Sequence, residues 1–256
     1  LPGTIHTAAK EIEQAGGKAL PLGCDIRFED QVQTAVAKTV ETFGGIDICV
    51  NNASAVSITR LQDTEMKRFD LMSAINTRGT FLVTKTCVPH LRAARNPHVL
   101  VLSPPLDMKA KWFGGQVAYS IAKFGMSLCV LGLAEELKPD GIAVNALWPR
   151  TTIATAAIGN LLGGEAVMRM SRKPEILADA AHLVFGQPAG SFTGNFLIDD
   201  TFLYESGGVR DFVSYRIDPA AELAICFFVP DDSTPPPGVK AVHMDRRRSI
   251  ERAAKP

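Results

Sequence analysis

The sequence carries no excess of either charge, because 27 lysines and arginines balance 27 aspartates and glutamates. A chain without net charge gives no electrostatic reason to expect binding to nucleic acid or to a membrane surface. It also has no apolar run as long as the ~18–20 residues that cross a bilayer. Neither nucleic-acid binding nor a membrane span is therefore predicted.

The cysteine and histidine patterns of metal sites are missing as well. The five cysteines are scattered, without a Cys-x-x-Cys pair, and the five histidines have no metal-ligand spacing. Scattered cysteines near apolar strands are typical of free thiols that pack as small hydrophobic side chains. We predict a reducing compartment, no disulfide framework and no bound metal.

What the sequence does have is a regular alternation of helical and strand patterns. Helices are expected at 4–15, 29–43, 64–90, 115–138 and 174–186, and strands at 18–24, 46–50, 98–103, 142–147 and 195–199. This alternation is typical of a parallel sheet with helices on both faces. A length of 256 residues suits one such domain. The predicted fold class is α/β, a doubly wound parallel sheet of about five strands.

The composition changes at Pro230. The stretch 230–238 is rich in proline, and a short basic run at 245–252 follows it. Proline continues neither a helix nor a central strand. We therefore place the domain at 1–230 and expect 231–256 to be a disordered tail.

The most informative pair is Tyr119 and Lys123, four residues apart within the expected helix 115–138. Residues at this spacing share one helix face. A lysine ammonium beside a tyrosine favours the phenolate and lowers the tyrosine pKa from its usual ~10 toward the range of an acid–base catalyst. The same spacing also occurs on ordinary surface helices, so the pair by itself leaves both interpretations open.

Further motifs follow in order along the chain: Asn51-Asn52-Ala53, Asn76, Ser103, the Tyr119/Lys123 pair and Thr193-Gly194. This ordered set resembles the short-chain dehydrogenase/reductase family, over roughly residues 4–204. The resemblance implies a Rossmann-type fold. It also implies an oxidoreductase that moves a hydride between a nicotinamide cofactor, NAD or NADP, and a carbonyl/alcohol pair.

The resemblance implies a role for each catalytic residue. Tyr119 would exchange a proton with the substrate oxygen. Lys123 would lower the pKa of Tyr119 and bind the nicotinamide ribose. Both residues would therefore also border the cofactor. Ser103 would polarise the carbonyl, although a serine that ends a strand before a proline is an alternative. Asn76 would hold a water that links Lys123 to solvent.

Other positions match the family's cofactor groove. The resemblance places Asn51 and Ala53 beside the adenosine ribose, and Ile153 and Thr155 at the nicotinamide carboxamide. Asp25 would either approach the adenine amino group or cap the next turn. The choice between NAD and NADP is made in a segment with no counterpart in this sequence.

One element of the family is missing. A fold of this kind opens with a strand, a glycine-rich turn and a helix whose N-terminus holds the pyrophosphate. None of the double glycines at 16, 44, 163 and 207 joins a buried strand to the start of a helix. We therefore expect an N-terminally truncated sheet that lacks the first two strands and the first helix. A catalytically inactive scaffold that acts as a binding or interaction protein is the alternative function.

A closer resemblance, to one subgroup of the family, suggests the type of substrate, the assembly and the compartment. The phrases at 102–106, 144–149 and 191–196 are similar to one subgroup of the family that is fused to a lipid-carrier domain, which implies a lipid or other hydrophobic substrate. The family's four-helix interface would use the helices near 64–90 and 115–138 to form a homo-oligomer. The same subgroup implies a peroxisome or mitochondrion, with the cytoplasm as the alternative.

Overall fold

The computed structural model describes residues 3–162 and 164–243, and it is built on one four-stranded parallel sheet. The strands are β1 (Ile48–Asn51), β2 (His98–Val101), β3 (Ala143–Trp148) and β4 (Phe196–Ile198), paired in that order. Ile48 pairs with His98, and His98 with Ala143. The prediction that the strands near 46–50, 98–103 and 142–147 are adjacent and parallel is confirmed.

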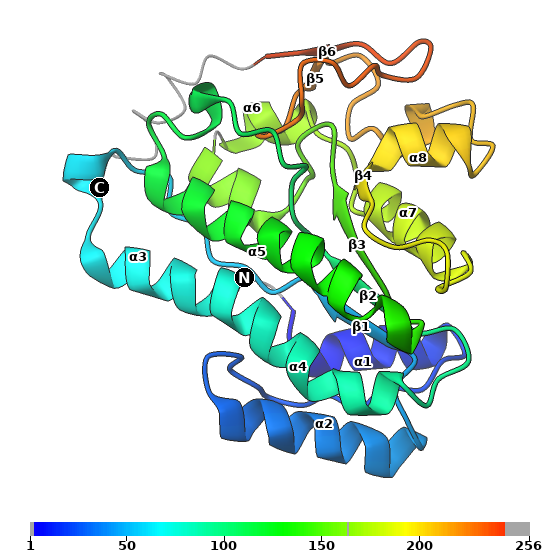
Figure 1. Cartoon of the computed structure of the whole chain (residues 1–256). Helices are drawn as coiled ribbons and strands as arrows, with labels where there is room; N and C mark the ends of the chain where they lie inside the picture. The colour runs from blue at the N-terminus through cyan, green and yellow to red at the C-terminus, as the bar shows by residue number, and fades with distance from the viewer. Residues whose placement is uncertain (1–2, 163, 244–256) are drawn as a thin grey trace.

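Helices cover both faces of the sheet (Figure 1). On one face α4 (Thr80–Leu91) and α5 (Val117–Glu136) pack on β1–β3, and α7 (Glu175–Phe185) packs on the other face of β3. Successive residues of a strand point to opposite faces. Accordingly Val99 and Val101 belong to the core under α4 and α5, whereas Leu100 belongs to the core under α7. The doubly wound α/β class is confirmed.

The remaining elements connect this framework. They are α1 (Ile5–Gln14), α2 (Glu29–Phe43), η1 (Leu61–Asp63), α3 (Met66–Met72), the π-helical turn η2 (Ser73–Gly79), η3 (Ala110–Trp112), η4 (Lys138–Asp140), η5 (Ile158–Leu162), α6 (Gly164–Arg169), α8 (Asp199–Glu205), η6 (Val213–Tyr215), β5 (Leu223–Ala224) and β6 (Ala241–Val242). The helices predicted at 4–15 and 29–43 are confirmed. Gly44 ends α2 with a φ of +87°, a conformation that glycine adopts without strain.

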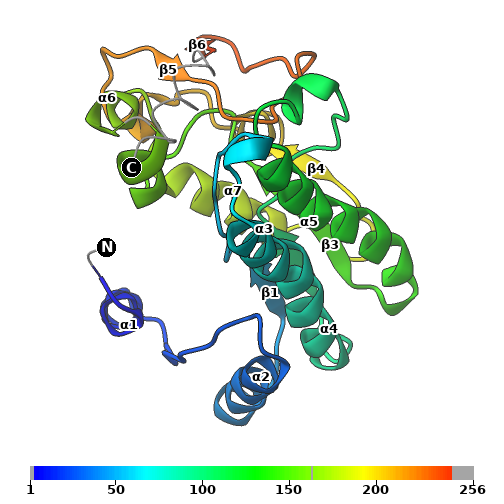
Figure 2. The same ribbon diagram turned by 90° about the vertical axis from the view of Figure 1, so that its left-hand side faces the viewer.

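The strand predicted at 18–24 is wrong. These residues are irregular, and no strand among the described residues lies beside them. An extended segment becomes a strand only when a neighbour supplies hydrogen-bond partners. The main sheet therefore has four strands instead of about five. Figure 2 shows α1, at the start of this region, set apart from the sheet, and only Ala9 of that helix is buried.

Residues 231–243 differ from the predicted disordered tail, while 244–256 lie outside the described residues. Figure 1 shows the C-terminal segment, in orange and red, crossing the end of the sheet on the side of α6. Arg150 donates to the Ser233 carbonyl at 2.9 Å, and Ile225 N–H donates to Val242 at 2.9 Å. These partners lie more than 15 residues away in sequence, where local composition gives no sign of them.

Helix α5 is long and apolar enough to cross a membrane by length and composition alone. Its position explains this composition in another way. Met126 and Val130 are fully buried against the sheet, and Ala122 is buried as well. An apolar helix of this kind is also what the centre of an α/β domain requires.

Candidate functional site

Ser103 lies directly beyond β2, at the edge of the sheet where parallel strands end and open α/β folds bind ligands. Its side chain is completely buried, and its hydroxyl has no hydrogen-bond partner among the described residues. A buried hydroxyl without a partner costs free energy. If Ser103 only ended the strand, its hydroxyl would be expected to form a hydrogen bond with the nearby backbone. The unpaired hydroxyl therefore favours a serine that donates a hydrogen bond to a ligand or accepts one from it.

Lys123 of α5 reaches the same edge. Its Nζ donates to the Leu102 carbonyl, next to Ser103, at 2.7 Å and lies 5.1 Å from the centre of the Trp148 ring. The side chain is buried, with no carboxylate at ion-pair distance among the described residues. Burial lowers the pKa of Lys123 to about 8. Lys123 is therefore a cation that can lose or share its proton near neutral pH.

Tyr119 lies one turn before Lys123 and is also buried. Burial, the larger cause, and the nearby Cys226 thiol raise its pKa above the ordinary value. The prediction that the neighbouring lysine lowers this pKa is therefore wrong for the structure. Lys123 is directed at the Leu102 carbonyl and the Trp148 ring, so desolvation of the phenol is left uncompensated.

Asn76 lies in the π-helical turn η2, and such turns are frequent at functional sites. Its side chain makes two hydrogen bonds with the backbone of Ala55, at 2.7 and 3.0 Å, and so holds the loop after β1. A methyl group at Gly125 would collide with Thr77, so this glycine lets η2 approach α5. The water relay between Asn76 and Lys123 stays a prediction.

A segment that the sequence analysis missed covers this site. We call residues 223–230 the strap. Phe228 of the strap is fully buried, and its ring lies 5.3 Å from that of Phe124, 5.9 Å from Tyr119 and 6.0 Å from Trp148. The Trp148 indole donates to the Phe227 carbonyl at 2.7 Å. The run of seven apolar residues at 223–229 was the signal that could have revealed a buried segment.

Two features of the strap stand out chemically. Phe228 has a φ of +66°, which for a residue with a side chain costs about 1 kcal/mol or more. Cys226 is close enough to influence the pKa of both Tyr119 and Lys123, and burial raises its own pKa to about 12. Its thiol is therefore protonated and unreactive at neutral pH.

An ion cluster is connected to the strap and to the residues that follow it. Arg150, which follows β3, donates to Asp200 at 2.7 Å, and Arg172 donates to the same carboxylate at 2.9 Å. The Arg150 carbonyl accepts from Cys226 N–H, and its guanidinium also donates to Ser233. Burial, and then the charge of Asp200, raises the pKa of Asp199 to about 7.

The predicted cofactor residues are dispersed. Ala53 and Thr155 are exposed. Asn51, at the end of β1, is buried and donates to the Thr84 hydroxyl at 3.0 Å, so its amide is directed at α4. Ile153 packs in the core under α7.

For Asp25 the geometry matches the capping interpretation. Its carboxylate accepts from Arg27 N–H at 3.0 Å and pairs with the Arg27 guanidinium at 2.5 Å. These hydrogen bonds from Arg27 lower the pKa of Asp25. Among the described residues, no cluster of three His, Cys, Asp or Glu side chains could hold a metal ion.

Comparisons with known proteins give a consistent result. A family model described as enoyl-(acyl carrier protein) reductase matches residues 3–186. Hydroxysteroid dehydrogenase-like protein 2 of Danio rerio is 54% identical over 245 residues, which are 96% of this chain and 57% of that protein. The Homo sapiens protein of the same name is 52% identical over 229 residues, 90% and 54% of the two chains. The chain thus spans about half the length of these curated relatives.

A solved structure is similar over a larger share of its length. A short chain dehydrogenase of Mycobacterium thermoresistibile is 54% identical and superimposes with a TM-score of 0.85. The match covers 94% of this chain and 85% of that one.

Proposed function

Because this chain belongs to the short-chain dehydrogenase/reductase family, we propose that it is an oxidoreductase that acts on a carbonyl/alcohol pair with NAD or NADP. The observation that carries the proposal is the buried Ser103 hydroxyl, which has no hydrogen-bond partner in the described part of the chain and lies beside Leu102, the residue that Lys123 binds. The unpaired donor and the lysine without a counterion stand at the ligand-binding edge of a parallel sheet. A carbonyl oxygen and a ribose hydroxyl supply the partners that they lack.

The chemistry assigns one task to each side chain. In the reducing direction the Tyr119 hydroxyl gives its proton to the substrate oxygen, and in the oxidising direction the phenolate takes it back. Ser103 donates a hydrogen bond to that oxygen while charge develops on it. Lys123 stabilises the phenolate once its Nζ turns from the Leu102 carbonyl. A nicotinamide cofactor, when bound, supplies or accepts the hydride.

A hydrophobic substrate is supported by the walls of the site. The Phe228 ring packs against Tyr119, and the rings of Trp148, Trp112 and Phe124 pack around Phe228 in turn. Aromatic walls of this kind favour apolar ligands. Phe228 fills the space in front of Tyr119, so the strap moves before a substrate of any size reaches the phenol.

The two ends of the cofactor fit the described residues unequally. Ser103 and Lys123 suit the nicotinamide half, whereas no glycine-rich turn among the described residues joins a buried strand to a helix N-terminus. A dinucleotide depends on such a turn for its pyrophosphate. This observation favours the alternative function, a binding scaffold without turnover, for residues 1–256 taken alone.

A homo-oligomer is supported by the outer faces of α4 and α5. Phe81, Leu128 and Leu131 are each more than half exposed. Large exposed apolar side chains on neighbouring helices suit an interface between copies of the chain. Sedimentation of the wild type and of Leu128→Lys tests this assembly, and a wild-type monomer at micromolar concentration would contradict it.

The function is tested by separating binding from turnover. NADH and NADPH are titrated by fluorescence against this chain, with 7 alpha-hydroxysteroid dehydrogenase, whose solved structure holds NADH, as the positive control. Tyr119→Phe should lower turnover by roughly 10²–10⁴-fold and leave nucleotide affinity unchanged, because only the proton donor is lost. Tyr204→Phe, the same chemical change outside the site, should alter neither.

The two functions give opposite results. Nucleotide binding and turnover that fall with Tyr119→Phe support the oxidoreductase. Absence of nucleotide binding by the 256-residue chain, under conditions in which the control protein binds, supports the scaffold. Turnover that survives Tyr119→Phe would refute the role of Tyr119.

A further inference from the structure

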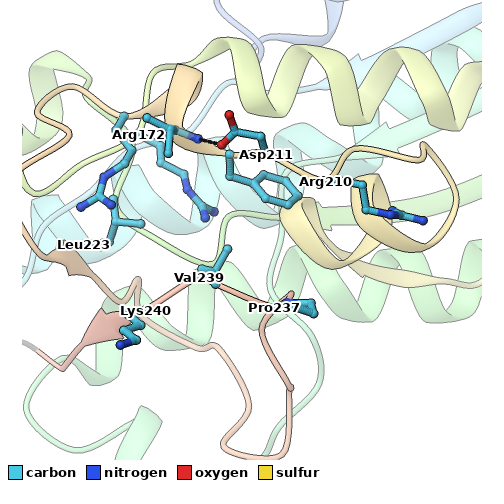
Figure 3. A pocket seen from close by; sticks show the side chains of 11 residues that line it. Arg172, Arg210, Asp211, Leu223, Pro237, Val239 and Lys240 are labelled. Atoms are coloured by element: carbon cyan, nitrogen blue, oxygen red, sulfur yellow. Dashed lines mark hydrogen bonds between the residues drawn. The ribbon is translucent and has the colours of Figure 1, made fainter.

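A cavity lies away from the Tyr119 site, between the loop after α8 and the C-terminal segment. Its volume is about 240 Å³. Figure 3 shows Arg172, Arg210 and Asp211 on one side, with Leu223, Val239 and Lys240 on the other. This volume is many times what a single water occupies. The cavity therefore has room for a small organic ligand or a group of one.

Arg172, one of the residues that line this cavity, has two hydrogen-bond donors without a partner among the described residues. The side chain is completely buried, and its Nη1 donates to Asp200 at 2.9 Å. Its Nε and Nη2 have no hydrogen-bond partner among the described residues, and the Phe212 ring lies 5.4 Å from the guanidinium carbon. Nε and Nη2 share one edge of the guanidinium. That edge matches two oxygens of a carboxylate or phosphate.

Other cations stand around the same space. Arg216 donates from Nη2 to the Ala221 carbonyl, while its buried Nε has no partner among the described residues. Lys240 is exposed at the rim and makes no ion pair with a described residue. Asp211, the carboxylate of the lining, accepts from Val213 N–H at 2.9 Å. Positive charge thus exceeds negative charge around the cavity.

We propose that this cavity binds the oxyanion group, phosphate or carboxylate, of a small ligand. The Nε/Nη2 edge of Arg172 holds two oxygens of the group, Arg216 Nε donates to it, and Lys240 attracts it at the rim. Leu223, Val239 and Phe212 offer apolar contact to the rest of the ligand. An anion here satisfies three buried donors that lack protein partners, which is a larger gain than the same contacts give at an exposed surface.

The proposal is tested by calorimetric titration of the full chain with inorganic phosphate and, separately, with butyrate at low ionic strength. The variants are Arg216→Gln and Lys240→Gln. Two matched controls remove the same charges from exposed positions elsewhere, Arg95→Gln and Lys38→Gln. Thermal unfolding establishes that each variant is folded.

Saturable binding is expected for the wild type and both controls. Arg216→Gln should weaken it at least tenfold, and Lys240→Gln by about two- to threefold, because an exposed charge contributes less. Binding of phosphate alone or of butyrate alone supports the site and selects its ligand class. Two results would overturn it: no saturable binding of either anion, as expected if the cavity holds only water, or equal weakening in Arg216→Gln and Arg95→Gln.

Discussion

Two regions of this molecule bury positive charge by opposite means. Arg150 and Arg172 share the carboxylate of Asp200, with hydrogen bonds of 2.7 and 2.9 Å. Among the described residues, the partners of Lys123 Nζ are the Leu102 carbonyl, the Met126 sulfur and the Trp148 ring. A buried charge is tolerated when it is paired and is costly when it is not. The first arrangement holds the strap in place, whereas the second leaves a proton that the protein binds weakly.

This difference gives a criterion for candidate functional residues that does not depend on any relative. A lysine kept buried without a carboxylate lowers the stability of the fold, so it is expected where function requires it. The arginine pair connects β3, the turn before α7 and the C-terminal segment. Its loss should therefore lower the free energy of unfolding. The following predictions are arranged from the largest expected effect to the smallest.

Asp200→Asn should remove the carboxylate that both arginines share. We expect a loss of about 3–5 kcal/mol in the free energy of unfolding, because two buried cations lose their partner. Asp199 can replace the lost charge only in part, because with a pKa of about 7 its carboxyl is only partly ionised at neutral pH. Urea denaturation measures the loss. Asp218→Asn, which breaks the exposed pair with Arg169, is the control and should change little. If Asp200→Asn and Asp218→Asn lower the free energy of unfolding equally, the buried arginine pair is not a structural centre distinct from the Lys123 region.

Lys123→Met should change how stability depends on pH. The folded pKa of about 8 lies below the ordinary 10.5, so the unfolded chain binds more protons between these values and wild-type stability rises with pH. The rise that Lys123 contributes is of order 1 kcal/mol between pH 7 and pH 9. The Lys123→Met variant should lack this rise in stability, and it should also lose turnover.

The measurement is the difference in urea unfolding free energy between wild type and Lys123→Met at the two pH values. Taking this difference removes most of the contribution of Tyr119 and Cys226. Both have raised pKa values, and their contributions to stability are lost only as the pH rises past about 9–10. Parallel curves for the two proteins would show that Lys123 is not desolvated.

Phe228→Gly and Phe228→Ala both remove a ring that packs against Trp148, the residue whose ring lies 5.1 Å from Lys123 Nζ. Both changes should therefore let water approach Lys123 and reduce the pH effect just described. They should differ from each other by about 1 kcal/mol, with glycine the more stable, because a φ of +66° strains alanine. At ordinary helix or strand positions glycine is the less stable residue. If Phe228→Ala is instead the more stable variant, the backbone at position 228 has left its positive φ once the ring is removed.

Much of the fold could be predicted from local pattern. The helix predicted at 29–43 has those bounds in the structure, since its apolar stripe and Gly44 are both local signals. Residues 18–24 carry an equally good strand pattern and are irregular, because a strand also needs a neighbour. The candidate site residues were predicted from motifs, and their roles stay predictions, but the pKa of Tyr119 was predicted in the wrong direction. Spacing reveals which residues share a helix face and gives no measure of how deeply that face is buried.

The sequence by itself determined the four strands of the main sheet, their order along the chain and the common face of Tyr119 and Lys123. These follow from periodicities of two and 3.6 residues, which any stretch of chain displays alone. Tertiary structure decided that Phe228 lies over Tyr119, that Arg150 and Arg172 share Asp200, and that Arg172 keeps two donors unpaired. Partners 28 to 109 residues apart in the printed sequence make these contacts. Their burial, pairing and pKa values exist only when the chain has brought them together and excluded water.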